Sequence, residues 1–407
     1  MRERVEALMR GRGGSVGAIV VPGVIFGLVL AGIAIDQPAA FGGYIVAVAL
    51  AIVFLGRSGV ITPLRDVTRG PLGRAVSFLL ILVFPFTQLH NPLWIRVAGL
   101  GAIFAALALG LNIVVGRAGL LDLGYAAFFG IGAFSGAMFS DCARCPMQHH
   151  LPWALALLIS GLFGAVFGVL LGTPVLRLRG DYLAIVTLGF GEIVRIALNN
   201  LDDVPLIHAN LTNGPNGLFG VGHPKIGPID LGSPIDVFGV EVPNVLKYYF
   251  VALLLMFVIV FVVRRMDSSR IGRAWTAIRE DEQAAQAMGI NTTIAKLLAF
   301  ATGAFFGGVA GNIFVHFQTG TSPDDFSFII SVTVLAMVVL GGMGNATGVA
   351  LGAVLLIALP EKLRFVSDYR FLIFGAILML MMRFRPEGLL PEQRRRRELK
   401  EQPEVTV

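Results

Sequence analysis

The chain has 407 residues, of which 56% are hydrophobic and 14% are charged, and its net charge is +6. Soluble domains carry about 25% charged residues, so the composition excludes a soluble globular protein. Lipid favours helices, which satisfy their own backbone hydrogen bonds, and we predict an all-α polytopic membrane protein. The sequence contains no GxxxxGK[ST], HExxH or GxSxG motif. We therefore expect no enzymatic activity, no ATP-binding site, no cofactor and no resident metal in this chain.

Twelve apolar runs are candidate membrane spans, and several are short enough to be re-entrant or broken. We therefore expect about 10–12 transmembrane or re-entrant segments. The runs are 16–35, 41–56, 75–89, 97–115, 124–140, 151–171, 182–198, 248–263, 297–317, 327–343, 347–360 and 371–382. The first run follows a basic segment, as a signal peptide would, but its length of about 20 residues favours an uncleaved span.

The distribution of Lys and Arg predicts the orientation. If the N-terminus is cytoplasmic and the spans alternate, the segments on the inner side, both termini included, hold 24 of the 32 Lys and Arg residues. Basic residues accumulate in cytoplasmic loops, so both termini are expected to be cytoplasmic. The positive charge thus reflects topology and does not indicate a nucleic-acid partner. The basic tail, residues 392–407, is expected to contact acidic membrane lipid.

Ionisable residues inside apolar runs are costly, so each needs a role. Glu192 and Arg195 lie three residues apart in the run 182–198, a spacing that places both on one helix face. They are either a structural ion pair or part of a polar path through the membrane. Asp122 lies in a region with six glycines between Gly116 and Gly136. These glycines indicate either close helix packing with a short inner turn from Gly116 to Asp122 or a broken helix that lines such a path.

Two features lie in predicted outer segments. The longest outer segment, residues 199–247, contains NGPNGL and other turn signals, and is either a connecting loop or a docking surface. Cys142 and Cys145 form a single CxxC motif near two histidines. One CxxC motif is a weak metal signal, and a disulfide or no role in transport are the alternatives.

A polar stretch, residues 264–296, separates two long apolar runs. Its apolar residues recur at helical spacing while its charged residues face elsewhere, which predicts one amphipathic helix. The apolar positions are Ile271, Ala274, Trp275, Ile278, Ala285 and Met288. Such a helix either lies at the membrane interface or inserts into a groove of a soluble partner.

Six segments, in this order, resemble the branched-chain amino acid ABC transporter permeases of the LivM type. They are GRAGLLDLGYAAFFGIGAF, GDYLAIVTLGFGEIVRIALNN, GPNGL, GRAWTAIREDEQAAQAMGI, VLGGMGN and FRPEGLLP. The resemblance implies a many-helix importer permease over residues 97–391, preceded by an N-terminal extension, residues 1–96, with about three spans. It also implies a bacterial inner-membrane location.

The resemblance further implies a set of partners. They are a second permease, two cytoplasmic ATPases that bind ATP and Mg, and an extracytoplasmic amino-acid-binding protein. Residues 264–296 would then couple the permease to an ATPase. Importer permeases often carry EAA followed by Gly; the matching residues here are Gln283, Ala284, Ala285 and Gly289, with Arg273 and Trp275 in the same segment.

Branched-chain amino acids are the expected substrates, and urea, short amides or other amino acids are the alternatives within the family. A secondary transporter driven by ions would need more intramembrane carboxylates than the chain offers. A membrane enzyme would need a cluster of polar catalytic residues, which the sequence does not show.

Overall fold

The computed structural model describes residues 12–35, 70–140, 151–175, 181–202, 210–227, 229–237, 240–364 and 388–390, with scattered positions in 37–48 and 369–383. The predicted spans 41–56 and 371–382 lie mostly outside these described residues. The tail 392–407 and the Cys142–Cys145 motif lie entirely outside them.

The chain divides into two compact units, Met1–Trp94 with Lys362–Ser367, and Ile95–Glu361 with Asp368–Val407. In the first unit, α2 (Arg12–Ala34) packs against α5 (Pro71–Thr87). Phe26 and Phe84 meet edge to face, with their ring centroids 6.4 Å apart. Lys362 Nζ donates to Ile33 O at 2.7 Å, which ties the returning segment to the end of α2.

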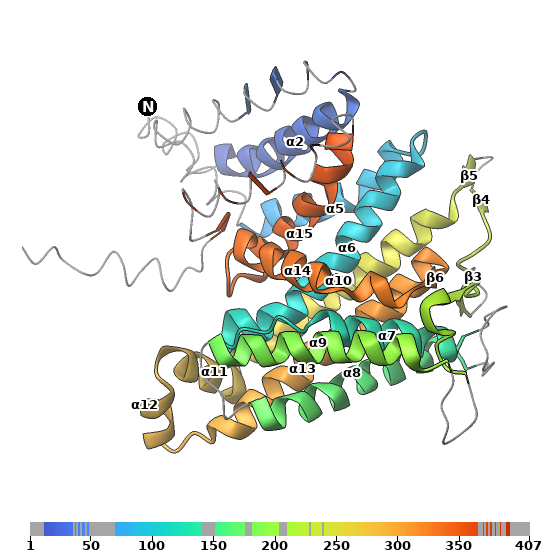
Figure 1. The fold of residues 1–407 in the computed structure, drawn as a ribbon. Coiled ribbons are helices and arrows are strands. Elements are labelled where there is room, and N and C mark those ends of the chain that lie inside the picture. Colours follow the sequence, from blue (N-terminus) through green and yellow to red (C-terminus); the bar gives the residue numbers. More distant parts are fainter. Residues whose placement is uncertain are drawn as a thin grey trace, which may run out of the picture. The chain divides into compact units, whose positions relative to one another are not determined.

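The remaining elements are mainly helices (Figure 1). In chain order they are α6 (Pro92–Asn112), the π-helical turn η1 (Ile113–Arg117), α7 (Ala126–Met138), α8 (Trp153–Val175), α9 (Asp181–Asn200), the 3-10 turn η2 (Gly214–Asn216), β1 (Leu218–Phe219), β2 (Lys225–Ile226), β3 (Ile229–Asp230), β4 (Ile235–Val237), β5 (Val240–Val242), α10 (Asn244–Asp267), α11 (Arg270–Glu280), α12 (Glu282–Ala287), α13 (Thr292–Gln318), β6 (Gly320–Thr321), the 3-10 turn η3 (Pro323–Phe326), α14 (Phe328–Gly341) and α15 (Ala346–Lys362).

Six helices within the described residues are long and apolar enough to cross a membrane, which confirms an all-α polytopic membrane protein. They are Gly17–Ala34, Pro92–Arg117, Trp153–Val175, Tyr182–Asn200, Asn244–Asp267 and Thr292–Gln318. Each matches one predicted run to within a few residues. By contrast, α7 and α14 have 13 and 14 residues. At 1.5 Å per residue they are about 20 Å long, shorter than the hydrocarbon layer.

The core of the second unit consists of α7, α8 and α13, which approach each other through glycines. A Cβ on Gly132 of α7 would collide with the backbone of Gly308 of α13. On α8, Gly164 lies against the carbonyl of Ala304 in the same way. Gly164, Gly168 and Gly172, at every fourth position of α8, face α13, a spacing of small residues that lets two helices pack closely.

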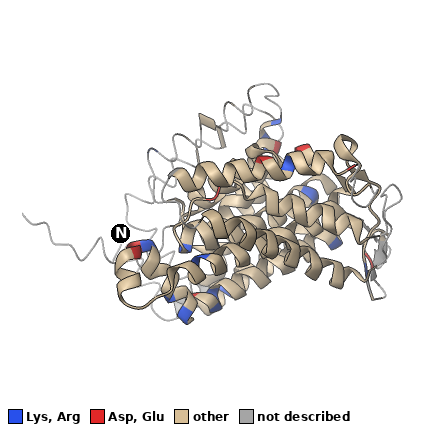
Figure 2. Cartoon of the chain, turned by 60° about the horizontal axis from the view of Figure 1, so that its bottom comes forward, with Lys and Arg blue, Asp and Glu red and all other residues tan. Residues whose placement is uncertain are grey.

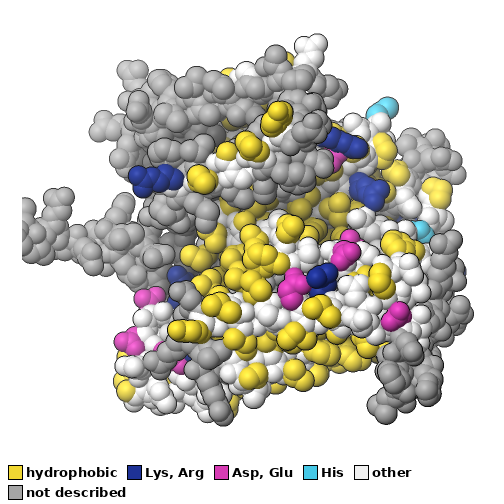
Figure 3. Space-filling view, in the orientation of Figure 1, with side chains coloured by type: hydrophobic (Ala, Val, Ile, Leu, Met, Phe, Trp, Pro, Cys, Tyr) yellow, Lys and Arg dark blue, Asp and Glu magenta, His cyan; other side chains and the backbone are white. Residues whose placement is uncertain are grey.

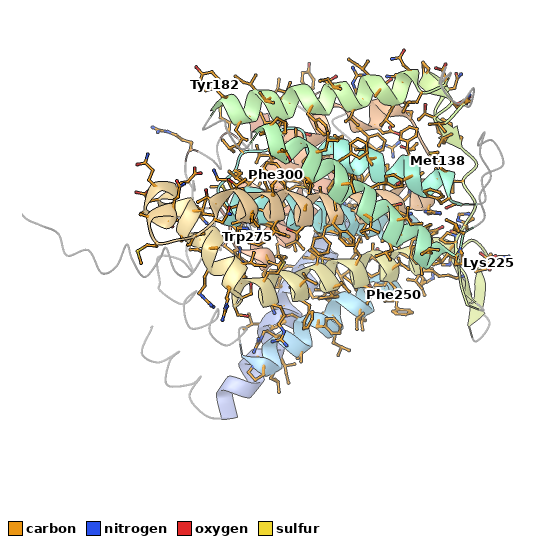
Figure 4. The ribbon with its side chains drawn as sticks, turned by 90° about the horizontal axis from the view of Figure 1, so that it is seen from below. Met138, Tyr182, Lys225, Phe250, Trp275 and Phe300 are labelled. Carbon is orange, nitrogen blue, oxygen red and sulfur yellow. The ribbon has the colours of Figure 1, made fainter. Side chains whose placement is uncertain are left out.

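The connecting segments gather at two opposite ends of this unit. The turn after α6, α11–α12 and residues 341–346 meet at one end, where Arg279 Nη1 donates to Gly116 O and Gly344 N donates to Asn112 Oδ1. The β-strands lie at the other end, as Figures 1 and 4 show. Long stretches of the helices carry no charged side chain, as Figure 2 shows. Three of the segments predicted to share the inner side, those that follow α6, α10 and α14, therefore lie together.

The long segment 199–247 contains more regular structure than its turn signals indicate. β2 pairs with β3 and β4 pairs with β5 as short antiparallel hairpins. β1 pairs with β6 from beyond α13, with Leu218 opposite Thr321. This last ladder joins the segment to the end of the most central helix.

Candidate functional site

The polar stretch between α10 and α13 forms two helices, and the prediction of one amphipathic helix is wrong. Asp281 breaks the helix in an extended conformation, with φ −154° and ψ 111°. Its Oδ1 accepts from Gln283 N at 2.8 Å and from Ala284 N at 3.0 Å, so the residue that ends α11 also caps α12. We call residues 270–289, which contain both helices, the coupling segment.

The break at Asp281 also changes which residues face inward. Trp275, Ile278 and Ala285 are buried, as the helical spacing predicts. Met288 is instead 84% exposed and Ile271 is 38% exposed, so their predicted places on the buried face are wrong. For Met288 the physical reason is that α12 starts a new helical phase, and Gly289, at φ +84°, then turns the chain away. Ile271 lies in the first turn of α11, before the residues that pack against the bundle.

Two side-chain contacts fasten the coupling segment to the start of α13. Trp275, which is 1% exposed, donates from Nε1 to Ala295 O at 2.7 Å. Lys296 is buried, and its Nζ donates to Glu282 Oε1 at 2.5 Å. Figure 4 shows Trp275 and Phe300 of α13 at the same end of the bundle. Each of the two helices therefore has a side-chain hydrogen bond to the first residues of α13.

A second pair of contacts joins the same region to the end of α6. Arg279 of α11 donates from Nη1 to Gly116 O at 2.6 Å. Arg117 pairs with Asp267 at the end of α10. Gly116 and Arg117 both belong to the π-helical turn η1, a backbone form that often marks functional sites. The coupling segment thus touches two long helices.

The predicted coupling residues separate into two groups. Arg273, Gln283, Ala284 and Gly289 are exposed. Trp275 and Ala285 are buried against the rest of the unit. The exposed group could contact another protein, whereas the buried group could only hold the segment in place.

Asp122 lies in the non-helical connection between α6 and α7 and is fully buried. Its Oδ1 accepts from Gly124 N at 2.9 Å, and the neighbouring Leu123 N donates to Thr187 Oγ1 of α9 at 3.0 Å. Burial raises the pKa of the Asp122 carboxyl to about 7, although the Gly124 hydrogen bond acts in the opposite direction. The structure does not bring Asp122 together with Glu192 and Arg195 in one hydrogen-bonded group.

Three buried side-chain atoms in the described part of the chain lack a hydrogen-bond partner, and all lie between the last residue of α6 and Asp122. They are Asn112 Nδ2, Arg117 Nε and Asp122 Oδ2. Unpaired buried polar atoms cost about 1–3 kcal/mol each. The stretch from the end of α6 to Asp122 therefore leaves polar atoms without hydrogen bonds, unlike the glycine-packed core beside it.

Glu192 and Arg195 form the ion pair that their spacing predicts, with Arg195 Nε 2.8 Å from Glu192 Oε2. Sequence analysis missed a third member: Arg195 Nη1 is 3.0 Å from Asp324 Oδ1 in η3. The available signal was that Asp324 follows Pro323 just before the apolar run 327–343. Sequence analysis also missed His316 and Asn312, buried polar residues of α13 that bond to Ser140 and Ser160.

Comparison with known proteins gives consistent matches. Residues 93–382 match the family described as branched-chain amino acid transport system / permease component. The chain is 42% identical to the high-affinity branched-chain amino acid transport system permease protein LivM of Salmonella typhimurium over 318 residues, 75% of this chain and 72% of that protein. Identity to LivM of Escherichia coli K12 is 41%, over 79% of this chain and 76% of that protein.

A second type of permease is also similar. Identity to the permease protein LivH of the Escherichia coli K12 branched-chain amino acid system is 26%, over 72% of this chain and 92% of that protein. No solved structure matches the chain.

Proposed function

Because the chain belongs to the family of permease components of branched-chain amino acid transport systems, we propose that it is one membrane subunit of an ATP-driven importer. The cargo is leucine, isoleucine or valine, and the membrane is the bacterial inner membrane. A second permease completes the pore, and an extracytoplasmic binding protein delivers the amino acid. Two cytoplasmic ATPases bind ATP and Mg and supply the energy, so this chain itself carries out no chemistry.

The observation that carries this proposal is the construction of the coupling segment. Its outer surface offers Arg273, Gln283 and Ala284 to a partner. Its inner surface is tied to α13 through Trp275 and Lys296. A displacement imposed on the outer surface would reach a membrane helix through these two contacts. This is the arrangement that a pore driven by a separate ATPase requires.

The predicted polar path remains a proposal in a narrower form. Glu192 and Arg195 lie on α9 with partly exposed side chains, so a substrate could reach them. Asp122 is sealed within the bundle, and it would join a path only if the connection between α6 and α7 opened. We therefore assign the path to α9 and assign Asp122 to the part of the bundle that moves.

Uptake of radiolabelled leucine tests the substrate. The gene is deleted and restored in a strain with no other leucine importer, and unlabelled isoleucine, valine and urea serve as competitors. Deletion should abolish uptake, restoration should return it, and only isoleucine and valine should compete. Unchanged uptake after deletion would contradict the substrate assignment, and competition by urea would favour an amide as cargo.

A deletion of residues 283–289 tests the coupling role. This variant should insert in the membrane in normal amount but should lose ATP-driven uptake. Normal uptake would remove the coupling assignment and leave the permease assignment intact.

A further inference from the structure

Two helices of the bundle expose long faces within the membrane, and these faces differ in chemistry. α8 exposes only apolar side chains over its middle, and its sequence from Trp153 to Val175 contains no charged residue. The exposed members of that face are Leu155, Leu158, Leu162, Val166 and Leu170. This surface suits the acyl chains of lipid.

α9 exposes a comparable row of apolar residues but interrupts it with charge. The apolar members are Ile185, Val186, Ile193 and Ile196. Among them lie Glu192 and Arg195, and Arg195 reaches Asp324, whose side chain is 82% exposed. Figure 3 shows acidic and basic side chains surrounded by hydrophobic ones on this side of the molecule. We call this surface of α9 and η3 the α9 face.

The distance of these charges from the helix end makes a plain lipid environment costly. At 1.5 Å per residue, Arg195 lies about 8 Å and Glu192 about 12 Å along the helix axis from its end at Asn200. A charged residue in hydrocarbon costs about 2.5–3.5 kcal/mol even on the most lenient scale. Two carboxylates and one guanidinium also leave a net charge of −1. Protein or water is therefore a more favourable cover for the α9 face than acyl chains.

The shape of the face favours another helix over water. A Cβ placed on Gly189 would meet nothing within 4 Å. Gly189 lies four residues from Ile185 and from Ile193, so it belongs to the same exposed row. Small residues in such a row let a second membrane helix approach closely.

The net charge of the Glu192–Arg195–Asp324 group favours a helix of a different chain over a helix of a second copy of this chain. A second copy of this chain, related by a twofold axis through the α9 face, would bring two groups of net charge −1 together, and like charges at an interface are costly. A different permease of the same family need not carry the same charges at this position. LivH of Escherichia coli K12 shows that a second type of permease shares similarity with 72% of this chain.

We propose that the α9 face binds the second permease subunit of the importer, with Gly189 at the closest approach and the Glu192–Arg195–Asp324 group paired with polar or basic residues of that subunit. This inference rests on the proposed function, and it places the substrate path at the boundary between the two permeases. The apolar face of α8 remains in contact with lipid.

Co-purification tests the proposal in its simplest form. The affinity-tagged full chain is expressed with the second permease, and the amount of that subunit recovered is measured. Gly189→Trp should reduce recovery at least tenfold, whereas Val166→Trp on α8 should leave it unchanged. Val166 is the control because it lies on the apolar face of α8 and is 60% exposed, so a tryptophan there is also accommodated at the surface. Yield and a single gel-filtration peak check that both variants fold.

The outcomes separate the proposal from its premise. Equal recovery for the two variants would overturn the α9 face as the interface. Recovery of a second copy of this chain, lost only in Gly189→Trp, would overturn the identity of the partner. If the unaltered chain recovers no second permease, the proposed assembly itself fails, and this inference fails with it.

A photo-crosslinking amino acid at position 193, with position 166 as the control, gives a second measurement that does not depend on disrupting the interface. Position 193 should form an adduct with the second permease, and position 166 should not. Adducts from position 193 with lipid alone, or with this chain itself, would overturn the proposal.

Discussion

In the bundle core, α7, α8 and α13 touch through their backbones, whereas the coupling segment is held by the ends of long side chains. Gly132 and Gly308 leave no room for a methyl group between their helices. Trp275, Arg279 and Lys296 instead reach across to carbonyl or carboxylate oxygens. The first kind of contact fixes position over many residues at once. The second kind depends on a few bonds that can break and form again.

This difference indicates which part moves and which part stays fixed. A backbone contact cannot lengthen without separating whole helices. A side-chain hydrogen bond can change partner at a net cost of about 1 kcal/mol. We therefore expect the coupling segment and the connection between α6 and α7 to rearrange during transport while the three-helix core keeps its packing.

The largest effect is expected in the core. Gly132→Ala places a methyl group against the backbone of Gly308, so the helices must separate and little folded protein should be recovered. Gly27→Ala in α2 is the control, because a Cβ there meets nothing within 4 Å. Yield and thermal melting in detergent measure both. Similar melting of the two variants would show that the core is not held by close backbone contact.

Trp275→Ala should release the coupling segment from α13. The loss of a buried tryptophan costs about 3–5 kcal/mol, and this cost falls on a small peripheral region. Hydrogen exchange in residues 270–290 should accelerate while exchange in α7 and α8 stays slow. Arg273→Ala, at an exposed position of the same helix, should leave exchange nearly unchanged. Faster exchange throughout the bundle would contradict the division into a fixed core and a separable segment.

Asp122→Asn should change the dependence of stability on pH. The folded protein holds the proton on Asp122 up to a pKa of about 7, compared with 3.8 for an ordinary aspartate. This group therefore stabilises the fold in acid, and the contribution disappears as the pH rises through 7. Asparagine stays neutral, so the variant should melt at the wild-type temperature near pH 4 and should be more stable at pH 8, by up to ~4 kcal/mol. An identical pH profile for both proteins would show that Asp122 is ionised without cost.

Gly289→Ala is expected to give the smallest effect. The residue adopts φ +84°, a conformation that costs an alanine about 1–2 kcal/mol. Open space surrounds the position, so strain is the only penalty. Uptake should fall by a few-fold while the melting temperature of the bundle stays unchanged. Full activity would show that the turn after α12 tolerates a different path.

Sequence patterns predicted the long helices well because length and apolarity suffice for them. The run 297–317 corresponds to α13, and the run 182–198 to α9. The patterns failed at Asp281, where a single residue divides the predicted amphipathic helix into two. Asp281 caps one helix and ends another, and no count of apolar positions reports that.

The candidate site was predictable only in part. The spacing of Glu192 and Arg195 gave their contact, since three residues on a helix place side chains together. Asp324 joins them from 129 positions further along the chain, a separation that only the fold can close. The burial of Lys296 could not be predicted from the sequence either, because its partner Glu282 belongs to another helix.

α13 is a single helix of 27 residues, about 40 Å in length. The hydrocarbon layer is about 30 Å thick, so the helix must tilt or project beyond it. Its first turn holds Lys296, and its far end leads directly into the β1–β6 ladder. A thinner or thicker bilayer would alter the tilt of this rod and would therefore shift both ends in concert. The acyl-chain length of the surrounding lipid would therefore influence the positions of both ends of α13, independently of any protein partner.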